Sequence, residues 1–468
     1  MSARVNILLI HADQHRADCL GVNGHPLLKT PHLDQLATEG VNFTHAYTPI
    51  PLCTPARTSL LTGQWPMQHG VITNYDAEAG RSLPLETPTV SQRLHEAGYF
   101  LGYVGKWGVD PRHTPLDFGF HVYHPESNYT KHRAAQGLPP QPATNRWFGE
   151  CDPYITPQQS QLAWGADRTI ELIHQATAQP EPFFLRWDPS APHLPNVPPE
   201  PYATMYPPAE IPPWPNFADP LTNKPYIQRQ QRRTWGIDDW TWQEWAPVVG
   251  RYLGEISLLD QQIGRVLAAL TAAGLAENTL VIYSADHGDL CGGHGMIDKH
   301  YVMYEELVRV PLLMRWPNAI AAGSTQHNFV SSALDLAATL CDAAGVTPIG
   351  SAAPSALQGQ SLLSLAQRNT STGARPDIYT TYHGNQFGLY SQRMVRDPHW
   401  KYIWNATAED ELYDLDRDPG ELVNCIDDEA CSQIRHRLRQ RLVIWMEATN
   451  DRLLNSWIRE QLLEGRKG

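Results

Sequence analysis

Five short apolar runs, each followed by polar or glycine-rich residues, limit the folds that are open to this chain. They cover residues 5–10, 99–104, 182–187, 279–284 and 311–316. Uninterrupted apolar runs of this length are typical of strands buried on both faces of a parallel sheet. Amphipathic helical patterns lie between them, as in residues 88–97 and 248–273. The alternation predicts an α/β fold, a large mixed, mostly parallel sheet sandwiched by helices.

The pattern changes after about residue 370. Short strand-like segments at 377–382, 388–395 and 401–404 precede a charged amphipathic helical pattern over 432–454, which predicts a smaller α+β domain on an antiparallel sheet. The chain has 468 residues, and single cores stop growing near ~250 to 300 residues. We therefore expect two domains, residues 1–370 and 371–468.

Two stretches, residues 125–160 and 189–245, are crowded with proline, tryptophan and polar residues. Such segments are more often long packed excursions over a sheet than separate domains. A tryptophan-rich excursion also offers a surface for a sugar ring, although filling the core is the commoner use of tryptophan.

Charge and hydropathy exclude several classes of partner. The formal net charge is −13 without a dense Lys/Arg block, which opposes binding to nucleic acid or acidic membranes. The first apolar run is short and lacks a cleavage site, and no run approaches the ~18 to 20 residues of a membrane span. We expect a cytosolic protein. The seven cysteines form no CxxC pair, so we expect reduced thiols.

Polar side chains follow the predicted strands at the points where they end. They are His11, Asp13 and Gln14, then Lys106, then Asp188 and His193, and finally Asp286 and His287. In open α/β sheets ligands bind beyond the carboxyl ends of the strands. The sequence therefore predicts that these groups converge on one site.

Asp13, Gln14, Asp286 and His287 offer two carboxylates, an amide oxygen and an imidazole. An oxygen-rich set suits a hard divalent cation such as Ca²⁺, with Mn²⁺ or Mg²⁺ as alternatives. The simpler use of an Asp after a strand is to cap a helix. Glycines close to Asp286 permit close backbone approach and favour a metal site.

Cys53 precedes Thr54 and Pro55, a good N-cap residue and a proline suited to the first helical position. We expect a helix to begin there, with its positive end stabilising a nucleophile or anion, and with Arg57 one turn further on. A lone cysteine is more often an inert, buried residue.

The segment Leu52–Arg57 reads Leu-Cys-Thr-Pro-Ala-Arg and matches the Cys-x-Pro-x-Arg signature of type I sulfatases, members of the alkaline phosphatase superfamily. Other segments resemble that family in the same order: residues 12–18, 30–34, 105–107, 191–193, 286–299, 395–397 and 411–415. In that family a maturation enzyme oxidises the signature cysteine to formylglycine. The resemblance implies an alkaline-phosphatase-like fold and the same modification of Cys53.

The resemblance also implies a role for each matching residue. Asp13, Gln14, Asp286, His287 and the modified Cys53 would bind the metal, usually calcium in this family. The implied catalytic set is Cys53, Arg57, Lys106, His193 and Lys299. Arg57 would orient the nucleophile, the two lysines would hold the sulfate oxygens, and His193 would face the bridging oxygen.

One position departs from the family pattern. Many relatives have a histidine after Gly-Lys-Trp, where this chain has Gly108. We expect His113 or His294 to supply the missing contact to the nucleophile. The predicted substrate-binding residues are Lys106, His193, Lys299 and His294.

The sequence thus predicts a sulfatase that hydrolyses a sulfated small molecule or oligosaccharide, with a carbohydrate preferred and a formylglycine-generating enzyme as partner. Two alternatives stay open: a phosphonate or phosphate ester hydrolase of the same superfamily, and a non-catalytic protein that binds sulfated glycans. Since the helical pattern after residue 432 could pair with a second copy, a homo-oligomer is possible.

Overall fold

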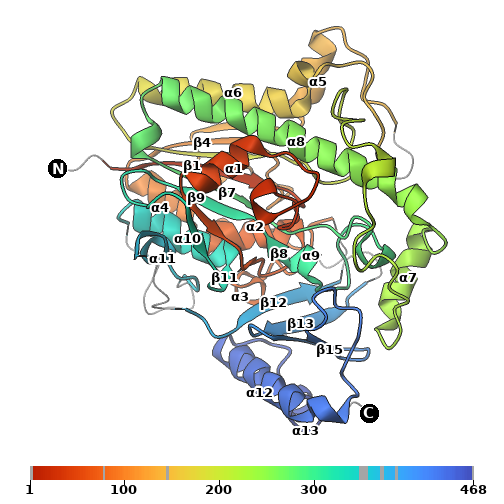
Figure 1. Ribbon diagram of the computed structural model, residues 1–468. Coiled ribbons are helices and arrows are strands. Elements are labelled where there is room, and N and C mark those ends of the chain that lie inside the picture. The colour runs from red at the N-terminus through yellow and green to blue at the C-terminus, as the bar shows by residue number, and fades with distance from the viewer. Residues whose placement is uncertain are drawn as a thin grey trace.

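The computed structural model describes residues 4–76, 80–143, 147–346, 357–368, 374–384 and 388–465. An eight-stranded sheet runs through its centre in the order β10-β2-β9-β7-β1-β6-β4-β5 (Figure 1). The strands are β1 (Asn6–Ala12), β2 (Val41–Phe43), β4 (Phe100–Gly105), β5 (Val122–Pro125), β6 (Phe183–Asp188), β7 (Thr279–Ala285), β9 (Leu312–Arg315) and β10 (Ser324–Gln326). A three-stranded sheet adds β3 (Ala46–Tyr47), β8 (Arg309–Val310) and β11 (Val330–Ser331).

The five predicted strands all form, as β1, β4, β6, β7 and β9. Four of them are parallel, with β1 between β6 and β7. The expectation of a parallel strand at 311–316 is wrong, because β9 runs antiparallel to both β7 and β2. For two consecutive strands to be parallel, the chain between them must cross back to the edge of the sheet where the first strand began, usually through an α-helix. Between β7 and β9, a stretch that the structure describes in full, the chain forms a 3₁₀ turn at Gly293–Gly295, the short helix α9 (Glu305–Val308) and the short strand β8, and no long crossover helix, so β9 runs back.

Helices cover both faces of the large sheet, as predicted. In Figure 1, α6 (Gln161–Thr177) and α8 (Trp242–Ala272) lie along one side. The other side carries α2 (Cys53–Thr62), α4 (Val90–Glu96), α10 (Ser332–Ala343) and α11 (Leu363–Arg368). The remaining helices of the large unit are α1 (Pro31–Thr38), α3 (Pro66–His69), α5 (Asn128–Ala135) and α7 (Tyr226–Trp235). No helix in the described part of the chain has both the length and the apolarity to cross a membrane.

The long helix α8 begins at Trp242, six residues before the predicted start at 248. Thr241 caps it in a box with Glu244, and Pro247 lies inside the helix near its start. Proline normally breaks a helix interior, which is why the sequence pattern hides this first turn. The excursion over residues 189–245 therefore contains α7 and the start of α8, and many of its tryptophans are packed: Trp245 is fully buried, and Trp242 contacts Phe217.

The C-terminal part forms an antiparallel sheet of β12 (Ile378–His383), β13 (Ser391–Arg396), β14 (Trp400–Asn405) and β15 (Glu411–Asp414). Helix α12 (Ser432–Ala448) packs on β13 and β14, and α13 (Ser456–Glu464) packs on α12. The fold class thus agrees with the prediction. The predicted domain boundary at residues 370 and 371 lies outside the described residues.

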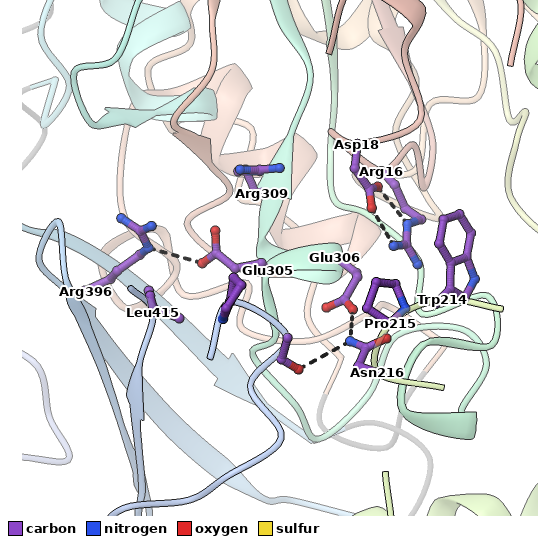
Figure 2. Close-up of a pocket in the computed structure, with 12 residues that line it drawn as sticks. Arg16, Asp18, Trp214, Pro215, Asn216, Glu305, Glu306, Arg309, Arg396 and Leu415 are labelled. Atoms are coloured by element: carbon purple, nitrogen blue, oxygen red, sulfur yellow. Dashed lines mark hydrogen bonds and ion pairs between the residues drawn. The ribbon is translucent and has the colours of Figure 1, made fainter. Parts of the chain in front are cut away.

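A charged pocket of about 300 Å³ lies where the smaller sheet meets the rest of the molecule (Figure 2). Several of its charges are paired within the wall: Arg16 binds Asp18 at 2.6 Å, and the Arg396 Nε lies 3.2 Å from Glu305. The second pair joins β13 to α9 across this contact.

Candidate active site

The carboxyl ends of four adjacent strands meet at one edge of the large sheet. Asp13 follows β1, Asp286 follows β7, Lys106 follows β4, and Asp188 ends β6. Because these strands are parallel neighbours, side chains far apart in the sequence come together there. The structure thus brings together the predicted strand-end groups.

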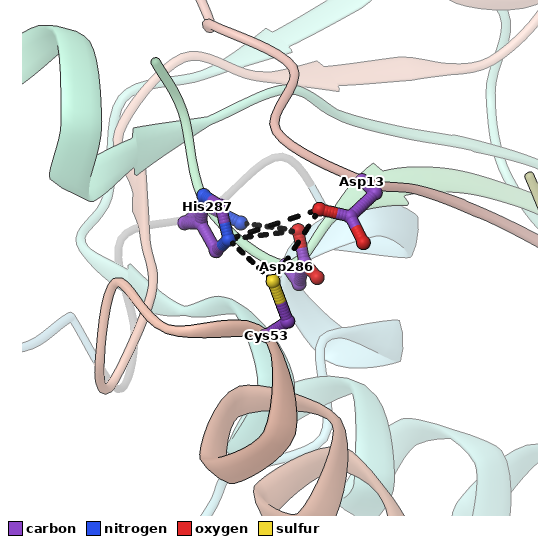
Figure 3. A group of neighbouring side chains, drawn as sticks. All are labelled: Asp13, Cys53, Asp286 and His287. Atoms are coloured by element: carbon purple, nitrogen blue, oxygen red, sulfur yellow. Dashed lines mark hydrogen bonds and ion pairs between the residues drawn. The ribbon is translucent and has the colours of Figure 1, made fainter. Parts of the chain in front are cut away.

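Asp13, Cys53, Asp286 and His287 form a compact buried cluster (Figure 3). One potential ligand atom from each lies within 4.8 Å of the others. The Cys53 Sγ is 3.3 Å from His287 Nε2 and 3.6 Å from Asp13 Oδ1. These four side chains could hold a divalent cation, since carboxylates and imidazole are ordinary metal ligands.

Hydrogen bonds around the cluster aim its ligand atoms inward. The ring Nδ1 of His287 lies 2.8 Å from the Gly288 carbonyl, to which it donates, so the lone pair on Nε2 faces the cluster. Burial lowers the pKa of His287, which favours the neutral imidazole that a metal requires. Arg57 holds the Oδ2 atoms of Asp13 and Asp286, while their Oδ1 atoms lie 3.8 and 3.7 Å from His287 Nε2.

Cys53 is the first residue of α2, and Leu52 occupies the N-cap position. The expectation that Thr54 caps the helix is therefore wrong by two positions. Its backbone N–H instead donates to the Asn74 side chain at 3.1 Å. The sulfur consequently lies at the positive end of the helix dipole, where a nucleophile or anion is stabilised.

Arg57 is fully buried, and its guanidinium binds three carboxylates. The donor–acceptor distances are 3.0 Å to Asp286, 3.1 Å to Asp13 and 2.6 Å to Asp188. Burial would lower its pKa, but these carboxylates hold it well above its usual value. Asp188 was named as a strand-end group, but its bond to Arg57 is not visible in the sequence. Only the fold brings these positions together.

Lys106 makes an ion pair with Asp13, and its side chain keeps 26% of its exposure. Burial would lower the pKa of Lys106, but Asp13 and the group at position 53 raise it, so the amine stays charged. Burial would raise the pKa of Asp13, yet Lys106, His193 and Arg57 hold it well below its usual value. A cation thus reaches from the solvent side to the cluster.

Lys299 and His193 are also brought together, although 106 positions separate them. The Lys299 Nζ lies 2.8 Å from the His193 Nε2, and it donates to Gln14 Oε1 at 3.0 Å and Asp298 Oδ1 at 3.2 Å. His193 Nδ1 donates to the Leu194 carbonyl at 2.5 Å. The part that Asp298 plays in holding Lys299 could not be inferred from the sequence.

Gln14 adopts a left-handed backbone with φ of 66°, and its amide N–H group donates to Asp289 and Asp298. Its oxygen accepts from Lys299, so in this arrangement it faces the lysine. The role of Gln14 as a metal ligand stays a prediction, since a carbonyl oxygen has a second lone pair.

The backbone conformation and the close packing at position 108 explain why Gly108 stands where a histidine is expected. Its φ is +60°, and a Cβ atom there would lie 3.0 Å from the Arg57 Cδ. A histidine would therefore strain the backbone and press on Arg57.

Neither suggested substitute contacts Cys53. His113 Nδ1 lies 3.4 Å from Asp110. Both ring nitrogens of the buried His294 are engaged, with Asp219 at 2.6 Å and Asn216 at 2.9 Å. The role of His294 in substrate binding stays a prediction.

Comparison with known proteins identifies the family of the chain. The sulfatase family model matches residues 5–346, and the model described as N-sulphoglucosamine sulphohydrolase, C-terminal, matches residues 292–448. An arylsulfatase of Clostridium perfringens is 29% identical over 494 aligned positions, covering 95% of each chain. An N-acetylglucosamine-6-O-sulfatase of Bacteroides thetaiotaomicron is 25% identical over 485 positions, covering 90% of this chain and 82% of that protein.

Among solved structures, the phosphonate monoester hydrolase of Agrobacterium radiobacter superimposes with a TM-score of 0.81 and 26% identity, covering 95% of this chain and 96% of that one. The fold is that of the alkaline phosphatase superfamily. Within it, the chain belongs to the sulfatase family. The protein is accordingly a sulfuric ester hydrolase.

Proposed function

We propose that this enzyme hydrolyses sulfate monoesters of carbohydrates, with a formylglycine made from Cys53 as the nucleophile and a divalent cation, preferably Ca²⁺, at the adjoining cluster. The observation that carries the proposal is the position of Cys53. Its sulfur lies at the first residue of α2, within 3.3 Å of His287 and 3.6 Å of Asp13.

The donor set fits a hard cation. Asp13 and Asp286 each supply a carboxylate oxygen that Arg57 does not bind, and His287 supplies an unprotonated nitrogen, all in a buried site. Gln14 and a hydroxyl at position 53 would complete the set. When bound, the cation neutralises negative charge on the sulfate group and favours ionisation of a nearby hydroxyl.

The lysines would bind the sulfate oxygens. Lys106 and Lys299 both carry pKa values raised by neighbouring carboxylates and by the group at position 53, which supports permanently charged side chains near that residue. Fixed cations aimed at developing negative charge stabilise a transition state strongly in a buried site. The two lysines would thus hold sulfur in line with the nucleophile.

The reaction then proceeds in two balanced steps. One hydroxyl of hydrated formylglycine attacks sulfur and releases its proton to solvent, while the bond from sulfur to the sugar oxygen breaks. His193, beside Lys299, gives the departing oxygen its proton. His193 regains from solvent the proton that it donates in this step. The second hydroxyl then reforms the aldehyde, and its proton leaves with the released sulfate. Water adds to the aldehyde and restores the hydrate.

A phosphonate monoester is the second candidate substrate, favoured by the close structural match to the Agrobacterium radiobacter enzyme. The cation Lys106 supports the sulfate ester, since phosphonate hydrolases tend to carry neutral hydroxyl residues in that segment. Catalytic efficiency on 4-nitrophenyl sulfate and on 4-nitrophenyl phenylphosphonate would separate the two. A higher efficiency on the phosphonate would overturn the proposal.

The main experiment is sulfate release by the purified protein after co-expression with a formylglycine-generating enzyme. We expect sulfated sugars, N-acetylglucosamine 6-sulfate among them, to release sulfate. A protein that binds these sugars but releases none would instead be a non-catalytic glycan-binding protein. The cytosolic location, the division at residue 370 and a homo-oligomer stay predictions.

A further inference from the structure

Glu126 lies beside the candidate active site but has no part in the chemistry above. It directly follows β5, whose Pro125 pairs with Gly105 of β4, the residue before Lys106. The Glu126 backbone N–H donates to the Gly105 carbonyl at 3.3 Å. The charge of Lys106 also acts on the Glu126 carboxyl. Glu126 and Lys106 therefore leave adjacent strand ends on the same edge of the sheet.

A second connection links Glu126 to the segment that carries His193. The backbone N–H and the hydroxyl of Ser190 donate to Glu126 Oε1 at 3.0 and 2.9 Å. Glu126 thus touches the loops that hold Lys106 and His193, two residues near the site that keep some exposure to solvent.

Glu126 also lines a cavity of about 440 Å³, here called the Glu126 cavity. Helix α5 contributes Tyr129, Thr130 and Arg133 to its wall, and Glu126 and Ser127 come just before that helix. Gln161, the first residue of α6, also lines it. A hydroxylated ligand suits this lining, because it combines an aromatic ring with many hydrogen-bonding groups. The volume is within the range of small-ligand sites.

The charge that remains uncompensated in this cavity is negative. Arg133 is buried and bound to Asp152, with a distance of 3.1 Å from Nη2 to Oδ1, so its charge is compensated. Burial raises the pKa of Glu126, and the bonds from Ser190 offset this only in part. Further donors from a ligand would stabilise the carboxylate, whereas a second anion in the cavity would be repelled.

We propose that the Glu126 cavity holds the sugar ring of the sulfate ester, that Glu126 accepts hydrogen bonds from its hydroxyl groups, and that the enzyme therefore prefers neutral sugars to uronates. This inference rests on the proposed function and narrows its substrate class. Glu126 is a specificity residue, since it would contact the sugar and not the sulfur.

The test compares three esters: 4-nitrophenyl sulfate, a glucoside 3-sulfate and the corresponding glucuronide 3-sulfate. The variants are Glu126→Gln, which keeps the shape of the side chain, and Thr130→Trp, which fills the cavity from an exposed helical position. Glu181→Gln, at an exposed position before β6, is the matched control.

We expect Glu126→Gln to lower kcat/KM for the glucoside sulfate about tenfold more than for the aryl sulfate, mostly through KM, because one charged hydrogen bond is lost. In the same variant, the ratio of kcat/KM for the glucoside sulfate to that for the glucuronide sulfate should also fall. Thr130→Trp should weaken glucoside hydrolysis by at least the same factor relative to the aryl ester, and Glu181→Gln should change neither.

Equal losses on the aryl and sugar esters in both variants would overturn the inference, since Glu126 would then only support the Ser190 loop. An unchanged sugar-to-aryl ratio in Thr130→Trp would overturn it even if Glu126→Gln failed to fold. Wild-type protein that releases sulfate from none of the three esters would instead refute the proposed function.

Discussion

Two regions of this molecule bury several charges, and they do so in different ways. Around Cys53, Arg57 binds three carboxylates. Two of them, Asp13 and Asp286, direct their other oxygens toward His287, beside the half-buried Lys106. Beneath the C-terminal sheet, Lys401 binds Glu305 at 2.9 Å, Glu421 at 2.7 Å and the Met303 carbonyl at 2.9 Å.

The charges of the second group, around Lys401, are buried and paired with one another. Lys401 and Glu421 are almost fully buried, and a second cation, Arg396, balances the two carboxylates. Its charges bind one another and join β14 to α9. The first group keeps ligand atoms and a cation directed at one point, which is how a site differs from a structural ion pair. Substitutions should therefore separate chemistry from stability.

The largest effect should come from Cys53→Ala. Without the nucleophile, sulfate ester hydrolysis should fall by at least about a thousandfold, because groups that act as a unit lose nearly all activity together. The thermal midpoint should change little, since the substitution removes only the small polar group at the end of side chain 53. Initial rates and differential scanning fluorimetry would measure both. Activity that survives this change would rule out the proposed nucleophile.

Lys401→Met should lower stability and leave the activity of the folded protein unchanged. It leaves Glu305 and Glu421 buried with less compensation, and breaking such a group costs about 3 kcal/mol of unfolding free energy. The kcat of the folded fraction should stay near wild type. Urea denaturation would measure the loss, and adding Glu421→Gln should restore part of it. A normal stability for Lys401→Met would mean that the two regions do not differ as described.

Removal of the metal should affect the first region alone. Dialysis against a chelator should reduce hydrolysis about a hundredfold, because the charge on sulfate loses its main neutralising partner. Added Ca²⁺ should restore the rate, whereas an Asp286→Asn control should respond weakly. Full activity in protein shown to be metal-free by elemental analysis would contradict the assignment of the cluster.

The smallest effect concerns Asp260, a buried carboxyl that lies outside both regions and accepts from the backbone N–H groups of Leu33 and His32 at the start of α1. Burial raises its pKa to about 7, although those hydrogen bonds oppose the shift. The folded state then holds its proton more tightly than the unfolded state, so stability is full near pH 4 and is lost as the pH rises through about 7.

Asp260→Asn should remove this dependence. Between pH 4 and pH 8, the free energy of unfolding of wild type should fall by up to about 2 kcal/mol more than that of the variant. Urea denaturation at both pH values would measure the change. Parallel pH profiles for the two proteins would refute the shifted carboxyl.

Much of the site could be predicted because buried parallel strands leave continuous apolar runs, and polar residues at their ends must share an edge. The contacts of single residues could not. The bond from Asp188 to Arg57, the hold of Asp219 on His294 and the tight fit of Gly108 against Arg57 all depend on distant segments that only the complete fold brings together.

The central claim is that Cys53 becomes the nucleophile through oxidation to an aldehyde. Mass spectrometry of the peptide containing residues 52–57, after co-expression with a formylglycine-generating enzyme, tests it directly. The account predicts loss of the thiol, gain of an aldehyde, and sulfatase activity in proportion to the converted fraction. Full activity in protein whose Cys53 remains an unmodified thiol would contradict it.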